Sequence, residues 1–177
     1  MKKRKNFSTS AVIIHWVLAV SIFFLFISSW WMLALPYNEY RVLPFQLHKN
    51  IGITLVFLLL ALLYMRLRNP PDPIESPAYT PSMHRAAVLG HIALYVLIIL
   101  VCVSGYLSSS FSGWGTTLWW LVDLPEWGWE DEELNALFSE IHLWTCWMLL
   151  AVIAVHICGA VYHVFRMDGV VRRMLHL

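Results

Sequence analysis

Four long apolar runs dominate this sequence, at residues of about 10–35, 45–66, 84–110 and 134–166. Each run reaches the ~20 residues that a helix needs to cross a bilayer, and none has Asp, Glu, Lys or Arg at its centre. Hydrophobic residues make up 59% of the chain and charged residues only 13%, whereas about half of a typical soluble domain is apolar. The sequence therefore predicts an all-α membrane protein, a single domain over residues 1–177, whose four transmembrane helices form an up-down bundle.

Basic residues gather on one side of the predicted membrane. That side carries Lys2, Lys3, Arg4, Lys5, Arg66, Arg68, Arg85, Arg166, Arg172 and Arg173. The other side has only Arg41 and Lys49, and it carries Glu39 and the acidic segment 123–133. Because Lys and Arg are retained in cytoplasmic loops, we expect both termini in the cytoplasm. In a bacterium the protein would be a multi-pass protein of the inner (cytoplasmic) membrane, with its acidic loops in the periplasm.

Two connecting segments have unusual compositions. Residues 69–82 hold five prolines and no hydrophobic period, which predicts an extended linker. Residues 108–133 hold five tryptophans, namely Trp114, Trp119, Trp120, Trp127 and Trp129. Tryptophans of this kind are typical of an aromatic belt at the headgroup level. The alternative is a lid over a site on the periplasmic face, and the sequence leaves both open.

Eight histidines are present, and most of them fall in the apolar runs. Ionisable residues inside membrane spans are rare and are functional candidates by default, although a single one can serve as a hydrogen-bonding group between helices. His142 and His156 stand 14 residues apart in the fourth run. This spacing is nearly four helical turns, so both rings lie on one face, about 21 Å apart. His84 and His176 are expected to be solvated.

Two other histidines lie at depths that match this pair. His48 begins the second run near the periplasmic surface, as does His142, and His15 lies one turn into the first run near the cytoplasmic surface, as does His156. The natural pairs are thus His48 with His142 and His15 with His156. His91 has a depth close to that of His15, so the residues alone leave open which of the two is the partner of His156.

Two imidazoles that face each other suit haem iron better than a bare metal ion. Zn²⁺ usually takes four protein ligands, and no carboxylate or thiolate cluster is available to complete such a site. Haem iron needs only two axial ligands, and its macrocycle suits an apolar, aromatic-rich bundle. The chain has no CxxCH motif, so haem would be bound without thioether bonds. We therefore predict that the bundle encloses two haem b groups, which form a path for electrons across the membrane.

Short motifs surround these histidines: IIHWVLAV (His15), QLHKNIGI (His48), GHIALYVL (His91), EIHLW (His142) and AVHICGAVYH (His156 and His163). In their order and spacing they resemble the bacterial cytochrome b561 family over essentially the whole chain. The resemblance implies a four-helix membrane bundle with two b haems. It further implies that the iron ligands are His15, His48, His142 and His156, and so favours His15 over His91.

Four other residues are expected near the cofactors. His91 is either a contact of the haem or its propionates, or a hydrogen-bonding residue of the core. His163 lies seven residues past His156, on the same face and about 10 Å nearer the cytoplasm. There it would approach a haem propionate or a quinone head group, unless it is an ordinary interfacial histidine. Lys49 and Arg85 either neutralise propionates or serve as interfacial anchors.

The resemblance also implies two kinds of activity. Some family members oxidise superoxide at the periplasmic face and reduce ubiquinone, and others look like carriers between quinones and small periplasmic proteins. A superoxide site would gain from positive charge at its mouth, but only Arg41 and Lys49 supply it here, and the EWGWEDEE segment opposes it. The LHKNIGI and SGYL stretches resemble the subgroup thought to pair with lipocalin-like, isoprenoid-binding periplasmic proteins.

We therefore expect a quinone-linked oxidoreductase, with superoxide:ubiquinone oxidoreductase as one form of that activity. The expected cofactors are two haem b groups and ubiquinone. The expected partners are membrane lipid, quinone and a periplasmic isoprenoid-binding or redox protein, but no nucleic acid. One alternative is a cytochrome b anchor subunit of a larger dehydrogenase or hydrogenase. Another is a transporter that uses histidines for metal or protons, although its spans would lack the usual carboxylates.

Overall fold

Four long helices form the body of the molecule. The computed structural model of the chain describes residues 7–36, 39–74, 76 and 79–175, so the basic segment 2–5 and His176 lie outside the described residues. The helices are α1 (Thr9–Ala34), α2 (Val42–Arg68), α3 (Pro81–Phe111) and α4 (Glu132–Arg166). Each is long and apolar enough to cross a membrane. The predicted fold class, an all-α membrane bundle of four helices, is confirmed.

The other elements are short. The 3-10 helix η1 (Glu39–Arg41) leads directly into α2, and α5 (Arg172–Leu175) follows α4. Between α3 and α4, the strands β1 (Thr117–Leu118) and β2 (Val122–Asp123) pair antiparallel as a small hairpin.

Polar side chains begin three of the four long helices. Ser8, Thr80 and Asp131 each precede a helix, and each side chain accepts a hydrogen bond from the backbone N–H three residues further on. Such N-caps satisfy one of the N–H groups that the first turn of a helix leaves without a partner. The local sequence therefore sets where α1, α3 and α4 begin.

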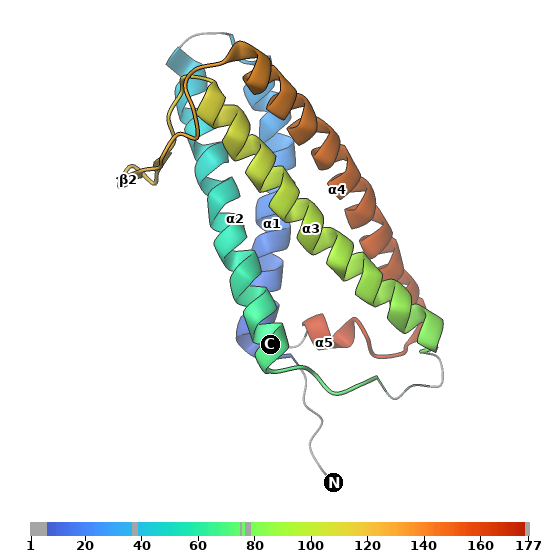
Figure 1. Cartoon of the computed structure of the whole chain (residues 1–177). Helices are drawn as coiled ribbons and strands as arrows, with labels where there is room; N and C mark the ends of the chain where they lie inside the picture. Colours follow the sequence, from blue (N-terminus) through green and yellow to red (C-terminus); the bar gives the residue numbers. More distant parts are fainter. Residues whose placement is uncertain (1–6, 37–38, 75, 77–78, 176–177) are drawn as a thin grey trace.

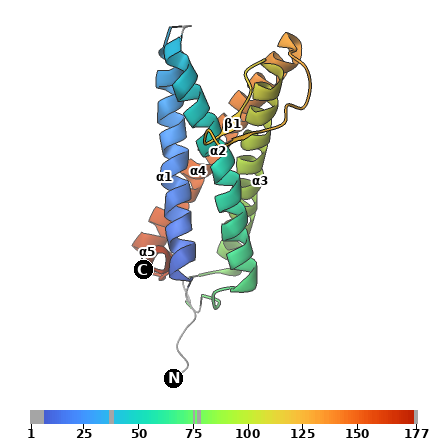
Figure 2. The same cartoon turned by 90° about the vertical axis from the view of Figure 1, so that its left-hand side faces the viewer.

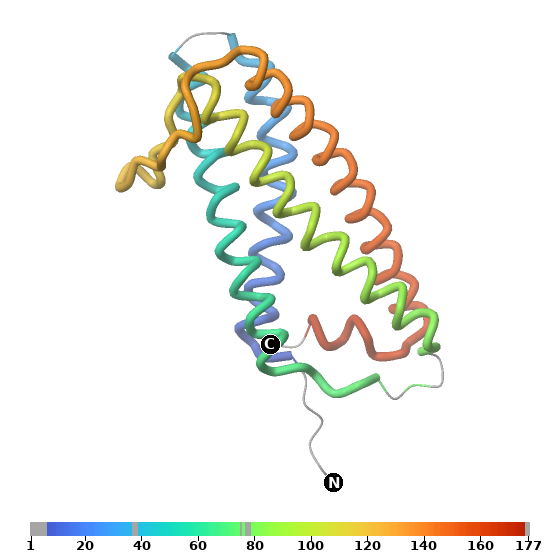
Figure 3. Tube along the Cα trace, viewed as in Figure 1, coloured from blue at the N-terminus to red at the C-terminus, as the bar shows by residue number. Residues whose placement is uncertain are grey.

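The bundle consists of two helical hairpins. α1 packs mainly against α2, and α3 packs mainly against α4, while α2 and α3 join the two hairpins (Figures 1 and 2). α1 begins at the same end of the bundle at which α5 lies, and we call this the terminal end (Figure 1). The opposite end carries η1 and residues 112–131, and we call it the loop end. Figure 3 follows the chain from α2 along the terminal end, where Asp72 accepts a hydrogen bond from Arg173 through its backbone oxygen, at 2.7 Å.

A buried apolar layer crosses the middle of the bundle and receives residues from all four helices. It consists of Leu18, Ile22, Leu55, Leu59, Ile98 and Leu149. Most other large apolar side chains of the helices point outward and are exposed, among them Phe24, Phe57 and Val155. An apolar exterior of this kind suits lipid as the solvent, and close van der Waals packing, rather than the hydrophobic effect, then holds such helices together.

Candidate functional site

The first histidine pair lies near the loop end. The rings of His48 in α2 and His142 in α4 have centroids 6.3 Å apart, and their planes are inclined by 76°. The His142 ring is fixed by α3, because its Nδ1 lies 2.9 Å from the backbone oxygen of Val101 and a Cβ on Gly105 would come within 3.0 Å of the ring. The hydrogen bond to a carbonyl makes Nδ1 the protonated nitrogen and leaves Nε2 as the free base.

The second pair lies near the terminal end. The rings of His15 in α1 and His156 in α4 have centroids 6.4 Å apart. His91 of α3 is also close to His156, with a centroid separation of 5.3 Å. The Nδ1 atom of His91 lies 2.6 Å from the backbone oxygen of Ala87, one turn earlier in the same helix. Three histidines from three helices therefore meet at this end.

The two pairs are separated by the apolar layer. His142 and His156 lie on one face of α4 about 21 Å apart, from their 14-residue spacing. Leu149 stands midway between them and is 3% exposed. Its neighbours in the layer are leucine and isoleucine side chains of the other three helices. An apolar layer therefore lies between the two pairs.

The spacing of the pairs fits two axial ligands of one metal ion. A ligand nitrogen lies about 2.0 Å from the metal and about 1.15 Å from the centre of its own ring, so two rings on opposite sides of one ion would have centres about 6.3 Å apart. Both the His48–His142 and the His15–His156 separations have this value within about 0.1 Å. The His91–His156 separation is shorter by about 1 Å.

The surroundings of the pairs fit a group that brings its own equatorial ligands. Within the described residues, no group of three or more His, Cys, Asp or Glu side chains is placed to hold a bare metal ion. Among the same residues, His48 Nδ1 and Asn50 Nδ2 are buried without a hydrogen-bond partner. A Cβ on Gly52 or Gly159, one turn after His48 and His156 respectively, would meet nothing within 4 Å. Open space and unsatisfied polar atoms therefore accompany the histidines, as a haem site requires.

The two basic residues expected near propionates differ in their surroundings. Lys49 Nζ donates to Ser109 Oγ and to the backbone oxygens of Trp114 and Gly115, at 3.0 to 3.1 Å. An ammonium has three N–H donors, so this lysine uses all of them, one to join α2 to α3 through Ser109 and two to join α2 to the loop. Arg85 is exposed in the second turn of α3, at the terminal end.

His163 belongs to a polar cluster at the terminal end that sequence reasoning found only in part. Its Nδ1 lies 2.6 Å from Asp168 Oδ2, and the Asp168 side chain has no exposed surface. Met167 adopts a left-handed φ of 49°, which turns the chain back so that Asp168 reaches His163. The Tyr79 ring, from the linker, lies 5.7 Å from His163. Burial, together with the nearby Asp168 carboxylate, raises the pKa of Tyr79 above its ordinary value.

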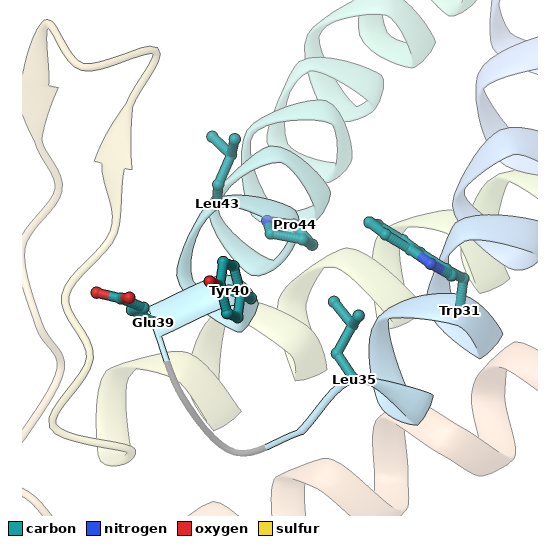
Figure 4. A pocket seen from close by; sticks show the side chains of 6 residues that line it. All are labelled: Trp31, Leu35, Glu39, Tyr40, Leu43 and Pro44. Carbon is teal, nitrogen blue, oxygen red and sulfur yellow. The ribbon is translucent and has the colours of Figure 1, made fainter.

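Other predicted residues lie apart from these sites. His84 is exposed on α3 and its ring meets the edge of Tyr79. A hollow of about 410 Å³ opens at the loop end between α1 and the start of α2 (Figure 4). Its walls are Trp31, Leu35, Glu39, Tyr40, Leu43 and Pro44. No histidine of the described residues lines this hollow, so the hollow is distinct from the sites of the two histidine pairs.

Comparison with known proteins bears on the chemistry of the histidine pairs. The model of a protein family described as "Prokaryotic cytochrome b561" matches residues 6–177. A protein of Escherichia coli (strain K12) named "Cytochrome b561 homolog 2" is 33% identical over 166 residues, which is 91% of this chain and 86% of that protein.

Proposed function

The chain belongs to the prokaryotic cytochrome b561 family, and on that premise we propose that it passes electrons between a donor at the loop end and membrane quinone at the terminal end. The resemblance read from the motifs is thereby confirmed. The chain is a multi-pass membrane protein that transfers electrons across the membrane with b-type haem. The number of haems, their ligands and the two redox partners are parts of the proposal.

Two haem b groups are proposed, one between His48 and His142 and one between His15 and His156. The observation that carries this assignment is the separation of the rings, 6.3 and 6.4 Å, which is the spacing of two axial imidazoles. When bound, each haem supplies an iron that changes between ferric and ferrous by one electron. The Val101 carbonyl, 2.9 Å from His142 Nδ1, orients that imidazole and increases its basicity as a ligand.

His91 is proposed as a neighbour of the second haem site and not as a ligand. Its ring centre is 5.3 Å from that of His156, about 1 Å too close for a position across one iron. Its Nδ1 is held by the Ala87 carbonyl at 2.6 Å. The ring therefore keeps its orientation without a metal and leaves Nε2 available to a polar group of the cofactor or to water.

The terminal end is proposed to face the cytoplasm. Six arginines lie at this end of the bundle or beside it: Arg66, Arg68, Arg85, Arg166, Arg172 and Arg173. The loop end carries the acidic residues of segment 123–133. Under the positive-inside rule, this distribution supports a bacterial inner membrane protein with its loop end in the periplasm.

The quinone head group is proposed to bind beside His163. Reduction of a quinone to a quinol takes two electrons and two protons, so its site needs a proton donor connected to water. His163 is 14% exposed by its side chain and is hydrogen-bonded to the fully buried Asp168 carboxylate. The carboxylate holds the Nδ1 proton and orients the ring, which leaves Nε2 as the nitrogen that can exchange a proton with a quinone oxygen.

The donor at the loop end is proposed to be a protein or an isoprenoid-bound partner. Glu126, Glu130 and the acidic start of α4 surround the loop. Lys49 lies among them, but its ammonium is used by the loop oxygens. A negative rim repels superoxide, so superoxide oxidation is the weaker proposal for this chain.

The proposed function is tested first by the spectrum of the purified protein. A dithionite-reduced minus oxidised spectrum, with a pyridine haemochrome count, is expected to give about two haem b per chain. A folded, colourless protein would contradict the whole proposal, and one haem per chain would contradict the paired sites.

The quinone site needs a separate measurement. In His163→Ala the two haems should remain, while electron exchange with a soluble quinol slows. Phe165 lies two residues after His163 on α4 and is 81% exposed, so Phe165→Ala provides the matched control. Equal quinol kinetics in both variants would remove His163 from the proposal without affecting the haem sites.

A further inference from the structure

A tryptophan-bearing hairpin lies between α3 and α4 and has no role in the function proposed above. We call residues 117–123 the tryptophan hairpin. Its strands are β1 and β2, and its turn consists of Trp119, Trp120 and Leu121, closed by a hydrogen bond of 2.9 Å from Leu121 N to the Leu118 oxygen. Figure 1 shows the chain leaving the loop-end tip of α3, descending beside α2 to this hairpin and returning to the start of α4.

Two hydrogen bonds fix the depth of the hairpin along α2. Trp119 N donates to Asn50 Oδ1 at 2.8 Å, and the Trp119 indole Nε1 donates to Thr54 Oγ1 at 3.0 Å. Asn50 and Thr54 lie about 12 and 18 Å along the helix axis from Val42. When α2, about 40 Å long, is centred on a hydrocarbon core about 30 Å thick, the two positions lie about 7 and 13 Å inside the core from its loop-end boundary. Figure 2 shows the hairpin in front of α2 and below the loop-end tips of the helices.

The two strands of the hairpin pair their backbone groups with each other. Thr117 pairs with Asp123 and Leu118 with Val122, and Leu124 N donates to the Thr116 oxygen at 2.9 Å. The amide of Trp119, at the turn, is satisfied by Asn50, whose side chain is fully buried. A chain segment can enter hydrocarbon only when its N–H and C=O groups find such partners.

The side chains at the tip are large, apolar and directed outward. Leu121 is 84% exposed, and Trp120 and Val122 are each 56% exposed. Trp119 and Trp120 have φ values of 47° and 58°, a left-handed conformation that is normally occupied by glycine or asparagine in such turns. Two tryptophans are kept in a strained turn, and the described residues leave 41% of Trp119 and 56% of Trp120 exposed, which indicates that the remaining cover comes from outside this chain.

We propose that the tryptophan hairpin is inserted among the phospholipid acyl chains of the leaflet at the loop end, where it forms the lipid-facing wall beside Asn50. The occupant of its exposed face is lipid because the hydrogen bonds to Asn50 and Thr54 set the tip within the span of α2. Asp123 lies at the base of the hairpin, about 10 Å from the tip at the rise of a strand, and its carboxylate accepts from Thr117 Oγ1 at 2.7 Å.

The hairpin and the first histidine pair lie on different faces of α2. Asn50, whose Oδ1 accepts from Trp119 N, lies two residues after His48 and therefore about 200° around the helix. The inserted hairpin thus covers the face of α2 that is turned away from His48. An aromatic belt at the headgroup level, in contrast, would leave Trp120 and Leu121 near the water surface.

The proposal is tested with an environment-sensitive probe in liposomes. The three native cysteines, Cys102, Cys146 and Cys158, are replaced by alanine, and a single cysteine labelled with the fluorophore NBD is introduced by Leu121→Cys. The matched control is Trp129→Cys, because Trp129 belongs to the same loop and is 81% exposed. Each protein is placed in phosphatidylcholine vesicles with or without brominated acyl chains, and aqueous iodide is added separately. The reduced-minus-oxidised spectrum checks that each variant binds haem as the unsubstituted chain does.

The probe at position 121 is expected to emit at shorter wavelength, to lose most of its emission to brominated chains and to keep it in iodide. The probe at position 129 should show the reverse. Quenching by iodide at both positions would overturn the proposal and leave a headgroup belt. Protection from both quenchers at position 121 would also overturn it, because a second copy of the chain or another protein would then cover the tip.

A second variant tests the anchor itself. Thr54→Val removes the acceptor for Trp119 Nε1 while it keeps a β-branched side chain of the same size. The probe at position 121 should then become more accessible to iodide, with the haem spectrum retained. An unchanged quenching pattern in this variant would refute the role of Thr54 in setting the depth of the hairpin.

Discussion

The choice of the histidine opposite His156 gives the sharpest prediction. His15 and His91 both approach His156, from α1 and from α3, with ring centroids at 6.4 and 5.3 Å. Two imidazoles on one iron need about 6.3 Å. To serve as the ligand, His91 would have to move away from His156 by about 1 Å, which would break its 2.6 Å contact with the Ala87 oxygen or displace α3. His15 needs no such movement.

The substitution His15→Ala should therefore lower the haem content from two to one per chain. His91→Ala should leave two haems and change only the surroundings of one of them, seen as a small shift in its potential or its α band. The pyridine haemochrome count and a redox titration of the purified variants measure both quantities. Added imidazole should restore the missing low-spin haem in His15→Ala, because the small ligand fits the space that the side chain leaves.

The imidazole rescue distinguishes loss of a ligand from loss of the fold. His84→Ala, an exposed histidine on α3, is the control for a histidine removed without effect on either site. If His91→Ala lost a haem that imidazole restored, while His15→Ala kept both, the argument from ring separations would be refuted.

Three further predictions follow from single contacts. In Gly105→Ala the new Cβ would lie 3.0 Å from two ring atoms of His142, closer than ordinary van der Waals contact. Overpacking of this kind costs about 1–3 kcal/mol, so haem binding should weaken at the loop end alone. The haemochrome count measures this loss. Replacing Lys49 by methionine removes charged hydrogen bonds to the loop, each worth about 1.5–3 kcal/mol, so the loop should be cleaved faster by protease. The folded chain holds the Tyr79 proton more tightly because the pKa of Tyr79 is raised. The stability that Tyr79 contributes is therefore present below its unfolded pKa of about 10 and is lost as pH rises through the folded value. Asp168→Asn should lower the folded pKa of Tyr79, as measured by a difference absorbance titration against Tyr79→Phe.

The fold could be predicted from the sequence because lipid leaves few choices. A span of apolar residues must satisfy its backbone internally, and a helix is the simplest way to do so. The helix starts are also local, since Ser8, Thr80 and Asp131 supply the capping oxygens. The chain direction then follows from short connections, which make consecutive helices antiparallel.

The histidine pairs could be predicted because depth in a membrane can be read from position in the sequence. The spacing of His142 and His156 places both on one face of α4, and the starts of α1 and α2 bring His15 and His48 to matching levels. The separation of His91 from His156 could not be read in this way. It differs from the His15 separation by about 1 Å, and such a difference depends on how the helices cross.

The contacts that depend on chain reversals were missed for a related reason. Asp168 reaches His163 only because Met167 takes a left-handed conformation, which no residue type in that segment demands. The contact of Asn50 with Trp119 joins positions 69 residues apart and depends on the path of a loop. The sequence did hold one indication of this contact. Asn50 is a polar amide in an apolar run, two residues after His48, and a buried amide needs hydrogen-bond partners.

α4 has a special place in this arrangement because it supplies one histidine to each pair. The distance between the two proposed haems is therefore set by the rise of one continuous helix, about 21 Å between His142 and His156, and not by how the helices pack. Small shifts of α1 or α2 alter the geometry within a pair but leave that distance unchanged. Changes at His15 or His48 can thus alter the affinity for one haem while they leave the spacing along α4 unchanged.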